Sequence, residues 1–154
     1  MQTLLSVLIT VQFLVVVAHD WVTIPGWTYS AQVQAVVGRR KLLLATLINA
    51  IFPGLAVAFA LFFWSQPKPR FVANYWLIYC AITLISAILM WYVPYCMGTS
   101  KKTTQEYATM YAGTRHILPP RGDHPRPNLL HLCFHALFLV TFSLSLVLWS
   151  SAAV

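Results

Sequence analysis

Four long apolar stretches without a charged side chain constrain this chain more than any other feature of its sequence. They run from Met1 to Ala18, Leu42 to Trp64, Phe71 to Tyr95 and Leu129 to Trp149, and together they cover more than half of the 154 residues. A helix needs about 20 apolar residues to cross the hydrocarbon core of a bilayer, which is about 30 Å thick. The sequence therefore predicts an all-α, four-span transmembrane helical bundle that forms one integral membrane domain over residues 1–154.

The composition excludes several other classes of protein. Hydrophobic residues make up 59% of the chain and charged residues 8%, whereas an average soluble domain is about 25% charged. The net charge of +7 is spread over the connections and does not form a basic stripe, so no nucleic-acid partner is expected. The expected partners are the lipid bilayer and either other membrane subunits or further copies of this chain.

The distribution of basic residues predicts the orientation, because positively charged loops remain in the cytoplasm. The second connection holds only Lys68 and Arg70. The connections over 19–41 and 96–128 hold the other eight basic residues: Arg39, Arg40, Lys41, Lys101, Lys102, Arg115, Arg121 and Arg126. These two connections are therefore predicted to be cytoplasmic, with both termini outside and the protein in the plasma (inner) membrane.

The first apolar stretch has an alternative interpretation as a signal peptide cleaved after Ala18, where Val16 and Ala18 are small enough for such a site. It lacks the basic segment that usually opens a signal peptide. Cleavage would also place the basic third connection outside, against the charge rule. The sequence favours an uncleaved first span.

Each cytoplasmic connection is predicted to contain a short helix on the membrane surface. In the first, residues 28–37 place valines at helical spacing after a turn at Pro25-Gly26. In the third, Thr103 and Glu106 have the spacing of a capping box, and Tyr107, Met110 and Tyr111 form one apolar face.

Two features concern the ends and faces of the spans. Asn128 is placed to cap the fourth span. In the second span, Gly54 with Ala58 and Ala56 with Ala60 are small residues four apart, which lets another helix approach closely. That partner helix could belong to this chain or to another subunit.

Titratable groups gather on the predicted cytoplasmic side. In this topology all three acids and all five histidines fall there: Asp20, Glu106, Asp123, His19, His116, His124, His131 and His135. His131 and His135 lie one turn apart on the same face of the fourth span. An ionisable residue within a membrane span suggests a functional site, because its ring needs a polar partner where water is scarce.

Three kinds of ligand site are compatible with these residues. In a metal site, His131 and His135 supply two ligands and Asp20, Glu106 or Asp123 a third. In a cofactor site, His131 or His135 ligates a haem or chlorin, with His19 as the opposing ligand. In a lipid or quinone site, basic and histidine side chains bind an anionic lipid head group or a quinone ring near the cytoplasmic surface, with Arg39, Arg40, Arg121 and Arg126 as donors.

The sequence favours an interpretation in which these histidines bind no ligand. In it, His131 and His135 hydrogen-bond to Asp20, Asp123 or loop carbonyls and hold the proline-rich third connection against the bundle. No cofactor is required by the sequence.

One segment resembles a known family. Residues 38–53, with Arg39, Arg40 and Asn49, are similar to the span of the four-helix MAPEG enzymes that contains arginine and asparagine. That span has a glutamate where this chain has Ala50, and the third span here has no arginine. The resemblance does not extend to an enzymatic activity.

The sequence is most typical of a non-enzymatic accessory or interaction subunit of a larger membrane complex, one that contacts a cofactor, pigment, quinone or lipid near its cytoplasmic end. The alternative is a small membrane enzyme or redox protein whose metal or haem site is the histidine and acid cluster.

Overall fold

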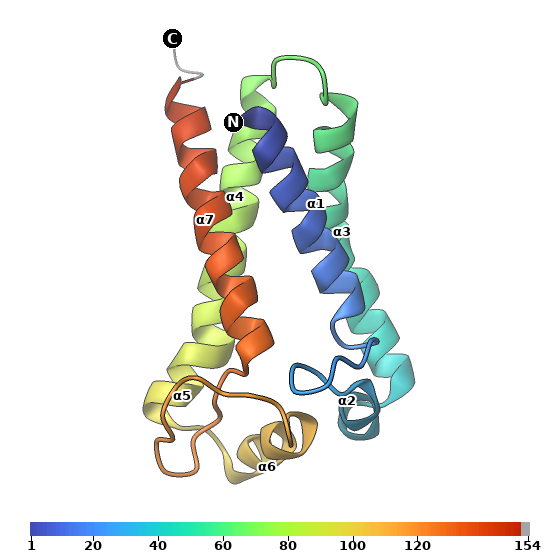
Figure 1. Cartoon of the computed structure of the whole chain (residues 1–154), viewed down its shortest axis with the longest axis vertical. Helices are drawn as coiled ribbons and strands as arrows, with labels where there is room; N and C mark the ends of the chain where they lie inside the picture. The colour runs from blue at the N-terminus through green and yellow to red at the C-terminus, as the bar shows by residue number, and fades with distance from the viewer. Residues whose placement is uncertain (152–154) are drawn as a thin grey trace.

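The computed structural model describes residues 1–151, so the last residues of the predicted domain, 152–154, lie outside it. It is all-α. The long helices are α1 (Gln2–Ala18), α3 (Arg39–Phe62), α4 (Arg70–Ala87) and α7 (Leu129–Ser151), and the short elements are α2 (Ser30–Val37), the π-helical turn η1 (Ile88–Tyr92), α5 (Val93–Met97) and α6 (Lys101–Met110). Figure 1 shows the four long helices running up and down alongside one another.

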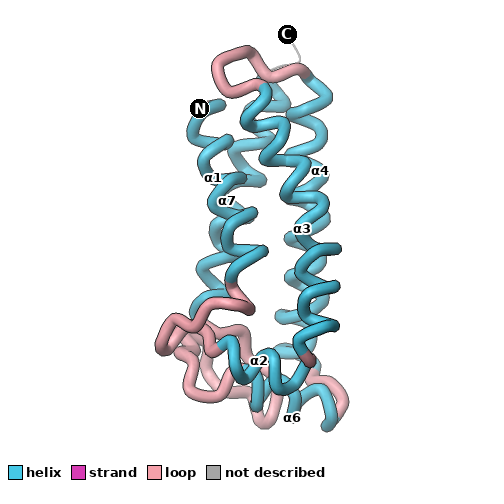
Figure 2. The backbone as a smooth tube through the Cα atoms, turned by 90° about the vertical axis from the view of Figure 1, so that its right-hand side faces the viewer, coloured by secondary structure: helices cyan, strands magenta, loops and turns pink. Residues whose placement is uncertain are grey.

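The N-terminus and the last turn of α7 lie at the same end of this bundle (Figure 1). The connection between α3 and α4 lies there too. At the opposite end, which we call the loop end, α2, α6 and the two long connections cover the bundle, as Figure 2 shows from the side. The sequence predicted this sidedness, with the histidine-rich connections together.

Three helical segments within residues 1–151 are long and apolar enough to cross a membrane. They are α3, the continuous segment α4–η1–α5 over Arg70–Met97, and α7 over Leu129–Ser150. The apolar helix α1 has 17 residues and extends about 25 Å at 1.5 Å per residue, less than the usual hydrocarbon thickness. A multi-span helical membrane protein is therefore confirmed by length and composition, and the crossing by α1 stays a prediction.

Small side chains bring α3 close to its neighbours within the chain. Ala56 and Ala60 are fully buried, and a Cβ atom on Gly54 would lie 3.6 Å from the ring of Phe13 on α1. The partners of this small-residue face are thus helices of the same chain, while Ala58 is exposed. Trp76 packs into the same core, and its Nε1 donates to the carbonyl of Ala56 at 3.2 Å.

The side chain of Gln12 joins α1 to α7 inside the bundle, and its longer contact runs from Nε2 to the carbonyl of Leu137 at 3.4 Å. The amide of Gln12 donates to Thr141 Oγ1 at 2.6 Å, and both residues are fully buried. A hydrogen bond of this kind holds two apolar helices in one register, because lipid offers these groups no hydrogen-bond partner.

The third long segment is interrupted by the π-helical turn η1 and by Pro94. Proline has no N–H, so it cannot donate to the carbonyl of Met90, four residues earlier. The hydroxyl of Tyr107 on α6 donates to that carbonyl instead, at 3.3 Å. The proline thus gives α6 a point of attachment to the bundle.

The predicted apolar face of α6 packs on protein. The ring of Tyr107 lies 5.1 Å from that of Trp91, and the ring of Tyr111 lies 5.3 Å from it. The expectation that this face rests on the bilayer is wrong for these two tyrosines. The predicted capping box is also wrong: Ser100 is the N-cap and accepts a hydrogen bond from the backbone N–H of Thr103 at 3.1 Å.

Candidate functional site

A cleft of about 510 Å³ lies within the bundle, near the loop end. Residues of α1, α3, α4, η1 and α7 line it, and three of them are His19, His131 and His135. Ile48 and Phe52 of α3 and Ile82 of α4 also line the cleft and are more than half exposed. Because these exposed apolar side chains form its rim, the cleft opens sideways between α3 and α4, where lipid would meet it.

Asn128 fixes the first of the cleft's deep histidines. Its Oδ1 accepts hydrogen bonds from the backbone N–H and Nδ1–H of His131, at 3.0 and 2.7 Å. Its Nδ2 donates to the carbonyl of Trp27 at 2.9 Å. The predicted cap of α7 is confirmed, and because Nδ1 carries the proton, Nε2 of the neutral ring is left as an acceptor.

Aromatic rings surround His131. The ring of Trp91 lies 4.0 Å from it and that of Tyr111 lies 5.4 Å from it, centroid to centroid. The rings of His19 and His135 follow at 5.8 and 6.1 Å. The structure therefore brings the three predicted cofactor-binding histidines together at the cleft, with His131 adjacent to each of the other two.

His135 lies one turn deeper and is 9% exposed. Its Nδ1 lies 3.2 Å from the hydroxyl of Tyr92, the last residue of η1. Two residues of the π-helical turn thus contact the deep histidines. The ring of Trp91 packs against His131, and the hydroxyl of Tyr92 lies within hydrogen-bond distance of Nδ1 of His135. Single π-turns within α-helices are frequent at functional sites.

His19 follows α1 and is fully engaged by protein. Its Nδ1 donates to the carbonyls of Val15 and Val16, at 3.0 and 3.1 Å, and its Nε2 lies 3.3 Å from the carboxylate of Asp20. Burial raises the pKa of Asp20, and the charge of His19 opposes that shift. The imidazole of His19 thus partly offsets the cost of burying the Asp20 carboxylate.

Tyr79 is the least satisfied polar group of the cleft wall. It lines the cleft, is 6% exposed, and its hydroxyl has no hydrogen-bond partner among the residues that the structure describes. Buried hydroxyls nearly always have a partner, so Tyr79 carries an unusual unpaired hydroxyl in the interior of the bundle.

The other predicted site residues lie outside the cleft. Glu106 on α6 reaches Lys102 at 4.0 Å, and Arg39 and Arg40 are exposed at the start of α3. Arg121 lies over the ring of Tyr95, with 5.7 Å between its Cζ and the ring centroid.

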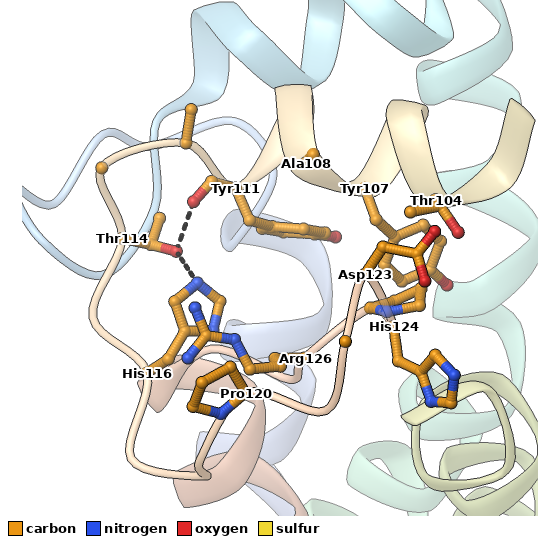
Figure 3. Close-up of a pocket in the computed structure, with 14 residues that line it drawn as sticks. Thr104, Tyr107, Ala108, Tyr111, Thr114, His116, Pro120, Asp123, His124 and Arg126 are labelled. Carbon is orange, nitrogen blue, oxygen red and sulfur yellow. Dashed lines mark hydrogen bonds between the residues drawn. The ribbon is translucent and has the colours of Figure 1, made fainter. Parts of the chain in front are cut away.

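Asp123 and Arg126 line a second, polar pocket of about 410 Å³ between α6 and the proline-rich connection (Figure 3). Thr114 Oγ1 joins the carbonyl of Tyr111 to Nε2 of His116 there, at 2.7 and 3.3 Å. Burial lowers the pKa of His116, and the charge of Arg126 adds to the shift.

The five predicted metal ligands are not assembled. No group of three histidines, cysteines or acids that could hold a metal ion occurs within residues 1–151. His131 and His135 adjoin one another, Asp20 pairs with His19, and Glu106 and Asp123 lie at the loop end.

Sequence patterns did not single out Tyr79, Tyr92 and Trp91 as site residues. Tyrosine and tryptophan are common in apolar spans and near their ends, and neither type marks a cleft by itself. The one available signal was Pro94, since a proline inside a span disturbs the helix just before it.

The fold and the cleft together define a small multi-span helical membrane protein. Its cleft opens toward lipid and has polar side chains at the loop end. Comparison with models of protein families, with curated proteins and with solved structures finds no match to this chain.

Proposed function

We propose that this protein is a small, non-enzymatic binding subunit of the plasma membrane, which holds an amphipathic ligand in the cleft between α3 and α4. The observation that carries the proposal is a mostly apolar, lipid-facing cleft with three imidazole rings at its loop end. Ligand sites usually combine an apolar wall with a few placed polar groups, at volumes of about 300–1,000 Å³.

The hydrogen bonds favour a ligand with an oxygen-bearing head over a metal or a bis-histidine haem. Both ring nitrogens of His19 already have partners, so axial ligation by His19 would break its contacts to Val15 and Asp20. His131 and His135 each keep Nε2 for a ligand, because Nδ1 is engaged. Nε2 of His131 can accept a hydrogen bond from a ligand hydroxyl, and Nε2 of His135 can face a donor or an acceptor according to its tautomer.

The charge distribution supports the orientation that the sequence predicted, with the loop end in the cytoplasm. The exposed basic residues of that end, among them Arg39, Arg40 and Arg121, then face anionic lipid head groups. The exposed outer faces of the long helices leave room for neighbouring subunits, which supports a place in a larger membrane complex.

Native mass spectrometry of the protein, released from its own membrane in mild detergent, tests the proposal. The wild type should carry a bound small molecule, and His135→Phe should lose it. His124→Phe is the matched control, because it also removes one ring hydrogen bond, from Nδ1 to the carbonyl of Tyr95, but lies outside the cleft. A folded wild type without any bound mass would contradict the proposal.

A further inference from the structure

The amide of Asn128 determines which nitrogen of His131 carries the proton. Its Nδ2 donates to the carbonyl of Trp27, and its Oδ1 accepts from the backbone N–H of His131. These two backbone partners fix the amide in one orientation, because a carbonyl only accepts and an N–H only donates. Nδ1 of His131 lies 2.7 Å from the same Oδ1 and must therefore donate to it. In the neutral ring, Nε2 is then an acceptor.

Nε2 of His131 has no hydrogen-bond partner within residues 1–151, and it is still accessible. His131 lines the cleft and is 8% exposed. In the described part of the chain, the fully buried side-chain atoms that lack a partner are Oε1 of Gln12 and the hydroxyl of Tyr79. Nε2 of His131 is not one of them, so it keeps accessible surface that a ligand in the cleft can reach.

The lining of the cleft offers no fixed partner to an ionised head group. None of the lining residues is Lys, Arg, Asp or Glu. The carboxylate of Asp20 pairs with His19 and does not line the cleft. A charged head group would therefore give up its hydration without gaining a side chain of opposite fixed charge, which is costly in an apolar site. The cleft suits a head group that is polar and uncharged.

The rest of the lining suits an alkyl tail. Phe134 and Phe138 line the cleft beside the histidines, and their rings pack edge to face at 4.8 Å. Ile78 and Ile82 of α4 belong to the same wall and are more than half exposed. A tail that lies along these side chains leaves the cleft toward lipid without crossing a charged group.

We infer that the ligand of the cleft is an uncharged lipid with a hydroxyl head group, such as a diacylglycerol or a long-chain alcohol, and that its hydroxyl donates to Nε2 of His131. This inference rests on the proposed function and names its ligand class. Ethers and carboxylates lack the proton that Nε2 accepts, so they should bind more weakly than an alcohol with the same tail.

The test compares three probes with one alkyl tail on the full chain in detergent micelles. They are octadecanol, its methyl ether and stearate, each with bromine atoms next to the head group, at a pH where stearate is ionised. Bromine quenches tryptophan fluorescence on contact, and the ring of Trp91 lies 4.0 Å from that of His131. The part of the quenching that Trp91→Phe removes therefore reports on the cleft.

The alcohol should bind about tenfold more tightly than its methyl ether, because the ether leaves the acceptor of His131 unpaired. Stearate should also bind more weakly than the alcohol, because its carboxylate loses hydration without a cationic partner. Equal affinities of the alcohol and the ether, or tighter binding of stearate, would overturn the inference and leave the cleft as a site for other amphipathic ligands. Absence of Trp91 quenching by all three probes would overturn the proposed function as well.

His131→Asn assigns the preference for the alcohol to Nε2. The amide nitrogen of the new side chain takes the place of Nδ1 and can still donate to Asn128, but nothing replaces Nε2. This variant should bind the alcohol about tenfold more weakly and no better than the ether. If it keeps the preference of the wild type, the role of His131 is overturned.

His124→Asn is the matched control. Nδ1 of His124 also donates to an oxygen, the carbonyl of Tyr95, and the residue lies outside the cleft. Its affinity for the alcohol should stay within about twofold of that of the wild type, and a loss as large as that of His131→Asn would contradict the assignment to the cleft. The comparison of alcohol and ether on the wild type decides the inference even if His131→Asn does not fold.

Discussion

At the scale of single residues, Asn128 connects three parts of the loop end. It caps α7, sets the proton of His131 on Nδ1, and holds the carbonyl of Trp27 in the first connection. The capping role could be predicted because asparagine directly precedes an apolar run. The contact to Trp27 could not, since it depends on a connection about a hundred residues away in sequence.

Asn128→Ala should lower the free energy of unfolding by about 1–3 kcal/mol, because it removes a helix cap and leaves buried polar groups unpaired. Chemical denaturation in detergent measures this change. Asn74→Ala, at an exposed position of α4, serves as the control. Equal stability of the two variants would show that the Asn128 contacts contribute nothing.

His116 is expected to make the loop end sensitive to acid. Its pKa is lowered from the ordinary value of 6.5, so the folded protein favours the neutral ring between Thr114 and Pro127. The stability from this preference is complete above pH 6.5 and is lost as the pH falls through the lowered pKa. The melting temperature of the wild type should therefore fall more steeply on mild acidification than that of His116→Gln, and parallel curves would contradict this.

At the scale of helices, the apolar stretches and their breaks predicted most of the architecture. The stretches over 42–64, 71–95 and 129–149 correspond closely to α3, to α4 with η1 and α5, and to α7. The π-helical turn η1 in the second of these segments could not be predicted from the apolar pattern, because its residues are as apolar as the α-helix around them. Trp76, near the start of α4, fills the core and hydrogen-bonds to α3.

The small-residue face of α3 gives a direct test of helix packing. Ala56→Leu should lower the free energy of unfolding by about 1–3 kcal/mol, because the added methyl groups overfill a fully buried position. Ala58→Leu is the matched control at an exposed position two residues away. If Ala58→Leu is the more damaging change, the face that packs within the chain has been misassigned.

At the scale of the whole molecule, the sequence predicted which residues share an end of the bundle but not how they are arranged there. Sidedness follows from the order of spans, so the meeting of His19, His131 and His135 could be expected. The cleft depends on how far α3 separates from α4, which no local pattern encodes. For the same reason the acids were grouped with the cleft histidines, although Asp20 lies beside His19 and Asp123 lines the separate polar pocket with His116 and His124.

The central claim, that an amphipathic ligand occupies the cleft between α3 and α4, is tested most directly by photo-crosslinking. A lipid analogue with a diazirine in its tail is added to native membranes, and the labelled residues are identified by peptide mass spectrometry. Ile82 lines the cleft at 57% exposure, while Ile85 on the same helix is 56% exposed and lies outside it. Our account requires labelling concentrated on Ile82 over Ile85; equal labelling of the two would show only general contact with lipid and would contradict it.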